Sequence, residues 1–115
     1  MITIEKLQEF GANTEEGLTR CMKNEALYLR LVATTPNEKN FDKLRTALDA
    51  GDLDGAFEAA HALKGVLGNL SLTPLYEKAV EITELLRAKT EMDYSPLEDE
   101  LFLLKNRLKD LCESD

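Results

Sequence analysis

Apolar residues recur every three or four positions along most of this chain, which is the spacing of one face of an α-helix. No segment alternates apolar and polar residues for long enough to form a strand. The pattern predicts helices over residues 4–10, 14–22, 25–34, 36–50, 53–69, 74–90 and 96–112. The last of them shows it most clearly, with an apolar face formed by Leu97, Leu101, Leu104, Leu108 and Leu111.

The connections between the four longer helices are short, and short connections favour antiparallel neighbours. We therefore expect an all-α fold, an antiparallel up-down four-helix bundle with additional short N-terminal helices. A chain of 115 residues is long enough for one domain with its own core. The expected single domain spans residues 1–115, with the bundle core at about 36–112 and the N-terminal helices at 4–34.

Three helix starts are indicated by a hydroxyl residue followed by proline, a pair suited to the N-cap and first helical positions. Glu38 and Glu98 each stand three residues after such a hydroxyl, which predicts two capping boxes. Asp52 is the expected cap of the helix 53–69. The hydroxyl-proline pairs are Thr35-Pro36, Thr73-Pro74 and Ser95-Pro96.

The single histidine of the chain, His61, lies within the predicted helix 53–69. We set it at zero on a helical wheel with about 100° per residue. On this wheel Lys64 lies at about 300°, Gly65 at about 40° and Gly68 at about 340°. The apolar face lies between roughly 160° and 260° and consists of Ala56, Ala59, Ala60, Leu63, Leu67 and Leu70. His61 is therefore predicted to be exposed, with Lys64, Gly65 and Gly68 on its side of the helix.

Glycine inside a helix costs about 1 kcal/mol relative to alanine, so Gly65 and Gly68 call for an explanation. One explanation is the close packing of a neighbouring helix. The other is clearance, because a bare backbone lets another protein approach the imidazole of His61. The sequence leaves both explanations open.

The charge balance argues against nucleic acid and anionic membranes as partners, since 14 Lys and Arg face 22 Asp and Glu for a net charge of −8. No segment has the length of a membrane-spanning helix or the pattern of a signal peptide. Cys21 and Cys112 lie far apart and have no metal-ligand spacing. They are expected to be thiols of a reducing compartment, with an end-to-end disulfide as the alternative. We expect a cytoplasmic monomer.

An exposed imidazole is largely neutral at pH 7 and is then a nucleophile. No serine, cysteine or second histidine near His61 in sequence supports a catalytic triad, and no phosphate-binding loop holds a nucleotide. A metal site would need more ligands than the nearby Asp54 and Glu58. The remaining interpretation is covalent: His61 accepts a phosphoryl group and Lys64 offsets its charge. Such a protein carries phosphate without a nucleotide site of its own and is not itself an enzyme.

The segment Ala60-His61-Ala62-Leu63-Lys64-Gly65, followed by Gly68-Asn69-Leu70, resembles the signature of histidine-containing phosphotransfer (HPt) domains of two-component phosphorelays. Gly17-Leu18-Thr19-Arg20 with Tyr28-Leu29 is similar to the helical lead-in of bacterial members. Leu48-Asp49-Ala50-Gly51-Asp52 is similar to the turn before their histidine helix, and the helix from Leu75 to Arg87 fits the partner helix of the family's bundle. The resemblance thus covers nearly the whole chain.

The resemblance implies that His61 is the phosphoacceptor, through Nε2, and that Lys64 stabilises the phosphate. It implies that Gly65 and Gly68 leave room for a receiver domain, and that Asn69 has a structural role.

The chain departs from the family pattern in three places. Val66 and Ser71 stand where many members have a small residue and a glycine. Thr83 lies near the place of a glutamine that orients the histidine in some members. Arg87 is a candidate second cation near the phosphate.

The partners implied by the resemblance are response-regulator receiver domains, which bring an aspartate and Mg²⁺, and a hybrid histidine kinase. No cofactor or metal is expected on this chain. Phe57, at about 320° on the wheel, is a candidate for an apolar docking patch or for the edge of the core. Asp54 and Glu58 are candidates for biasing partner choice.

Two other interpretations stay open. One is a bundle that binds a receiver or kinase without being phosphorylated. The other is the phosphoacceptor module of a chemotaxis-type kinase, which is normally part of a longer chain.

Overall fold

A computed structural model of the protein describes residues 1–114. These residues form seven α-helices and one 3-10 turn, with no strand among them, which confirms the all-α prediction. The elements are α1 Ile4–Phe10, α2 Thr14–Arg20, α3 Glu25–Thr34, η1 Thr35–Asn37, α4 Lys39–Asp49, α5 Leu53–Asn69, α6 Thr73–Arg87 and α7 Ser95–Glu113.

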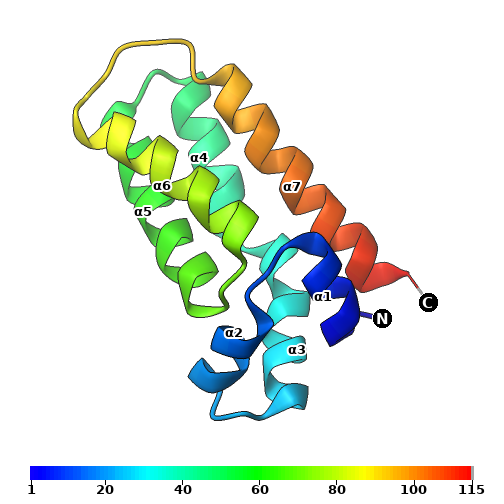
Figure 1. The fold of residues 1–115 in the computed structure, drawn as a ribbon. Helices are drawn as coiled ribbons and strands as arrows, with labels where there is room; N and C mark the ends of the chain where they lie inside the picture. Colours follow the sequence, from blue (N-terminus) through cyan, green and yellow to red (C-terminus); the bar gives the residue numbers. More distant parts are fainter. Residues whose placement is uncertain (115) are drawn as a thin grey trace.

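Helices α4 to α7 form the expected up-down bundle (Figure 1). Helix α5 packs against α4 on one side and α6 on the other, and α6 also packs against α7. The turns 50–52 and 70–72 are too short for anything but an antiparallel reversal. Helices α4 and α7 meet through an edge-to-face contact between Phe41 and Phe102, whose ring centroids are 5.9 Å apart.

The N-terminal helices pack around the end of this bundle. Helix α1 lies beside the C-terminal end of α7, and the two chain ends lie close together (Figure 1). Lys6 Nζ donates a hydrogen bond of 3.0 Å to Ser114 Oγ, and the Arg107 guanidinium lies 5.6 Å from the centroid of the Phe10 ring. Helices α2 and α3 extend past the end of α5 where α6 begins (Figure 1).

The core is formed by the apolar faces that the sequence predicted. Every apolar residue assigned to the inner face of α5 is buried: Ala56, Ala59, Ala60, Leu63, Leu67 and Leu70. The same hydrophobic cluster includes Leu7, Phe10 and Tyr28 of the N-terminal helices. The N-terminal helices and the bundle therefore share buried apolar surface.

The predicted capping box at Thr35 and Glu38 is wrong. Thr35 has helical backbone angles (φ −57°, ψ −43°), and its hydroxyl donates to the Leu31 carbonyl at 3.2 Å. An N-cap residue needs a non-helical backbone, which Glu38 has instead (φ −62°, ψ 122°), and the Glu38 carboxylate accepts from Asn40 N at 3.4 Å. Helix α4 therefore begins at Lys39, three residues later than predicted.

The predicted hydroxyl caps at Thr73 and Ser95 are wrong as well. Both residues are the first of their helices, and the Thr73 hydroxyl donates to the Ser71 carbonyl at 3.4 Å. Glu98 closes no capping box; it is buried and accepts a bond of 2.6 Å from Arg45 Nε. The predicted cap at Asp52 is confirmed, since its carboxylate accepts from Gly55 N at 3.0 Å.

Two helices end earlier than their hydrophobic pattern predicted. Helix α2 ends at Arg20 because Met22 and Lys23 have left-handed backbones, with φ of 56° and 59°. Helix α6 ends at Arg87, and Lys89 beyond it has φ 54°.

Candidate functional site

His61 lies in the middle of α5 and is exposed, as predicted. The Asp52 cap fixes the start of α5. The buried apolar face of α5 fixes the rotation of the helix about its axis, because it packs against α4 and α6. Because the backbone is held on the opposite face, the imidazole is presented to solvent on a rigid support. A helix is a more precise support for a reacting group than a loop.

Phe57 lies one turn before His61 and stacks on it. The two ring centroids are 5.7 Å apart and the ring planes differ by 14°. Phe57 is half-buried and packs against the core, so it serves both as the edge of the core and as a neighbour of the histidine. The guanidinium carbon of Arg87, from α6, lies 5.1 Å from the centroid of the Phe57 ring. Arg87 also pairs with Glu84, with Nε and Oε2 3.4 Å apart.

The two glycines of the histidine face have different surroundings. A Cβ atom added to Gly65 would meet nothing within 4 Å, so the space beside it is open. A Cβ atom added to Gly68 would lie 3.0 Å from Cε1 of Tyr76, a residue of α6. Close helix packing therefore accounts for Gly68, whereas clearance is the explanation that fits Gly65. The prediction that Gly68 admits a partner stays a prediction.

Beside these glycines lies a groove of 340 Å³. Lys64, half-buried, forms part of its wall together with Gly65 and Gly68. The opposite side comes from α2 and α6, through Glu16, Arg20 and Tyr76. The contribution of α2 to the groove could not be predicted, because helical periodicity does not show which end of a bundle a short helix covers.

The other residues considered near the histidine are engaged elsewhere. Thr83 is fully buried and its hydroxyl donates to the Ala79 carbonyl at 2.6 Å, so it does not take the place of an orienting glutamine. Asp54 Oδ1 lies 3.9 Å from Lys89 Nζ.

Among residues 1–114 no cluster of three or more His, Cys, Asp or Glu side chains has the arrangement of a metal site. Cys21 and Cys112 are both free thiols.

An exposed histidine on a helix of a four-helix bundle, with a lysine one turn further on, is what we expect of the phosphocarrier class that the sequence resemblance implies. Comparison with protein families supports this class directly. The Hpt domain family model matches residues 34–114, which is more than half of the chain, and the chain therefore belongs to the Hpt domain family. Hpt domains are helical bundles that serve histidine phosphotransfer in phosphorelays and interact with receiver domains and kinases.

The match includes all of α4 to α7 and hence His61, whereas α1 and α2 and nearly all of α3 precede it. Comparisons with curated proteins and with solved structures give no significant match. Within residues 1–114, none of the helices is both long and apolar enough to cross a membrane.

Proposed function

We propose that this protein is a phosphorelay intermediate that accepts a phosphoryl group on His61 from a receiver-domain aspartate and passes it to another receiver. The observation that carries the proposal is the exposure of the single histidine within the region of the family match, beside the open space at Gly65. A receiver must bring its own active site to the imidazole, and this is the face on which it can do so.

In the proposed transfer, the lone pair of His61 Nε2 forms a bond to phosphorus while the bond between phosphorus and the receiver aspartate breaks. The aspartate leaves as a carboxylate, and the reverse reaction on a second receiver restores the free imidazole. Phosphoryl transfer depends mainly on alignment and on neutralising charge. The receiver supplies Mg²⁺ for this purpose, and Lys64, one turn beyond His61, offsets the charge of the phosphoryl group on the imidazole.

The surroundings of His61 suit this role. Gly65 leaves room for the receiver. Gly68 lets the Tyr76 ring pack close to the backbone of α5, so that the ring protrudes less from this face. The Phe57 ring stacks on the imidazole of His61 and adds apolar surface beside it. We propose that the chain works as a monomer in the cytoplasm, downstream of a hybrid histidine kinase. The two free thiols support a reducing compartment.

A bundle that binds receivers without being phosphorylated is the alternative, and one experiment separates the two. The protein is incubated with a panel of phosphorylated receiver domains and Mg²⁺, and phosphate is detected by intact mass. The His61→Gln variant is run in parallel, and binding of each receiver is measured separately.

An acid-labile adduct on the parent that is lost in His61→Gln, with receiver binding retained, supports phosphotransfer. Binding of a receiver without an adduct on the folded parent would favour the interaction module and overturn the proposal.

A further inference from the structure

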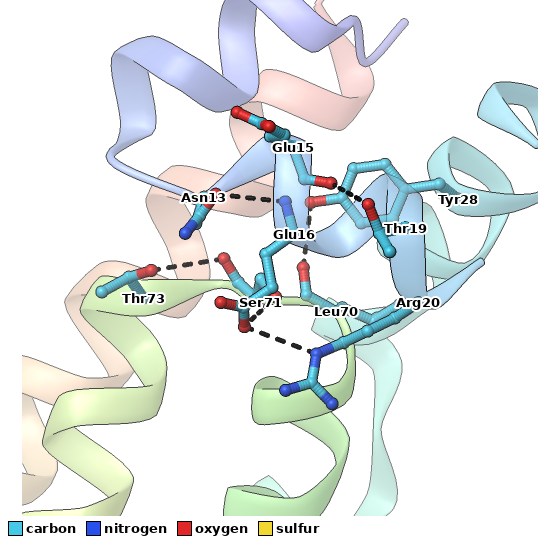
Figure 2. A network of polar contacts seen from close by, with 9 residues as sticks. All are labelled: Asn13, Glu15, Glu16, Thr19, Arg20, Tyr28, Leu70, Ser71 and Thr73. Atoms are coloured by element: carbon cyan, nitrogen blue, oxygen red, sulfur yellow. Dashed lines mark hydrogen bonds and ion pairs between the residues drawn. The ribbon is translucent and has the colours of Figure 1, made fainter. Parts of the chain in front are cut away.

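Hydrogen bonds hold helix α2 against the turn between α5 and α6, beside the groove lined by Lys64 and Gly65 (Figure 2). Asn13 N donates to the Ser71 carbonyl and the Tyr28 hydroxyl donates to the Leu70 carbonyl, both at 2.9 Å. Helix α2 lies so close to Tyr28 that a Cβ atom on Gly17 would be 2.6 Å from the ring. The position of α2 relative to the histidine helix is therefore fixed.

The same contacts orient a cation of α2. Glu16 Oε1 accepts from Ser71 Oγ at 2.9 Å and from Arg20 Nε at 3.4 Å (Figure 2). The Arg20 side chain is 51% exposed, and within residues 1–114 its ion pair with Glu16 is made through Nε alone. The two terminal nitrogens of the guanidinium are thus free to bind a carboxylate of another protein.

The groove is continuous with the proposed phosphotransfer face, because Lys64, Gly65 and Gly68 belong to both. Its walls carry two cations, Arg20 and Lys64, against the single carboxylate of Glu16. This is an unusual balance for a chain with a net charge of −8. The local charge therefore favours an acidic partner surface.

We infer that this groove receives part of the docked receiver domain, and that Arg20 pairs with an acidic side chain of the receiver surface that lies over the groove. The inference rests on the proposed function. Arg20 would then help to select the receiver through charge, from a helix outside the region of the family match.

The test compares Arg20→Glu with Arg30→Glu, which makes the same charge change at an exposed residue of α3 away from the groove. Transfer from the phosphorylated receiver is measured at several salt concentrations. Labelling of His61 by phosphoramidate, a small donor that needs no docking, is measured beside it. Arg20→Gln serves as a milder variant, because Glu16 and a new glutamate at position 20 would repel each other within α2.

We expect Arg20→Glu to lower the second-order rate constant for transfer about tenfold at low salt, and less at high salt, because charges at an interface act mainly on association. Arg20→Gln should show a smaller loss, and Arg30→Glu should transfer like the parent. Phosphoramidate should label the variants like the parent.

Parent rates for both Arg20 variants, or an equal loss in Arg30→Glu, would overturn the inference and leave the proposed function standing. The proposed function and the inference are both wrong if phosphoramidate phosphorylates the parent protein but none of the receivers that bind the parent transfers phosphate to it.

Discussion

The Phe57 ring lies nearly parallel to the His61 imidazole, with an angle of 14° between the ring planes and 5.7 Å between the centroids. Phe57 is in turn held between the core and the guanidinium of Arg87. We therefore expect Phe57, one turn earlier in the same helix, to orient the imidazole of His61. Thr83, which lies near the place of an orienting glutamine in some family members, donates its hydroxyl to the Ala79 carbonyl instead.

This stack predicts that Phe57→Leu slows transfer to His61 more than it destabilises the fold. Leucine keeps apolar contact with the core, so the free energy of unfolding should fall by less than about 1.5 kcal/mol. The flat support of the imidazole is lost, and small errors in alignment can cost up to about a hundredfold in rate. We expect a loss of about tenfold in transfer from a receiver, measured at saturating receiver concentration. A parent rate in a folded variant would show that the stack does not position His61.

Gly65 and Gly68 predict different results for alanine. Gly65→Ala should raise the free energy of unfolding by about 0.5–1 kcal/mol, because alanine favours the helix and its Cβ meets open space. Gly68→Ala should gain less or lose stability, because its Cβ would press on the Tyr76 ring. Denaturant unfolding of the two variants checks this difference.

The function of the open space at Gly65 is tested by a larger residue. Gly65→Gln should fold normally and still be labelled by phosphoramidate, yet take phosphate from receivers at least tenfold more slowly. Gly65→Ala provides the matched control with little added bulk. Unchanged transfer to Gly65→Gln would remove clearance as the reason for this glycine.

Lys64→Gln should lower the rate of transfer from a receiver about tenfold, and this loss should exceed the loss in binding of the unphosphorylated receiver. The reason is that the ammonium offsets charge that is present only once the phosphoryl group arrives, a charge-assisted contact of about 1.5–3 kcal/mol. Lys64→Arg should recover part of the rate. If binding falls by as much as transfer does, Lys64 contributes to docking alone and not to the phosphoryl group.

Stability at alkaline pH should depend on Tyr28. Burial raises the pKa of Tyr28 to about 12 from 10.0, with the nearby Cys21 as a smaller cause. The folded state therefore holds this proton more tightly than the unfolded chain. Its contribution is fully present below pH 10 and is lost as the pH rises to 12, by about 2–3 kcal/mol in all. Tyr28→Phe should flatten this decline.

The measurement is denaturant unfolding between pH 8 and 11.5 for the parent and for Tyr28→Phe. At pH 8 the variant should be less stable by about 1 kcal/mol, since the Leu70 carbonyl loses its donor. The gap between the two proteins should then close at about pH 11 and reverse above it, because the parent alone loses the contribution of the Tyr28 proton. A gap that stays constant would contradict the assigned pKa of Tyr28.

Much of the site could be predicted because it follows from one periodic helix. The apolar residues of α5 fix which face is buried, and this alone places His61, Lys64 and Gly65 on the exposed side. The explanation of Gly68 could not be chosen in advance, since it depends on the Tyr76 ring of another helix. The hydrogen bond from Arg45 to Glu98 could not be predicted either, because the two residues lie on different helices.

The predicted hydroxyl caps were wrong because a hydroxyl can donate back to a preceding carbonyl instead of accepting from the first turn of a helix. Thr35 precedes a proline, yet its hydroxyl bonds back to Leu31 and the chain makes one 3-10 turn before α4 begins. The start at Asp52 was predicted correctly because its carboxylate bonds within its own turn. A carboxylate can only accept, so a cap of this kind can be inferred from sequence, whereas the position of α2 beside the groove cannot.

The central claim is that phosphate resides on His61 Nε2, and nuclear magnetic resonance tests this most directly. The protein, with its histidine labelled in the ring nitrogens, is phosphorylated by the receiver that donates fastest, and the imidazole nitrogens are observed. The account predicts coupling to phosphorus at Nε2 of His61, and removal of this signal when a second, unphosphorylated receiver is added. Phosphate found on any other residue, or transferred equally to His61→Gln, would contradict it.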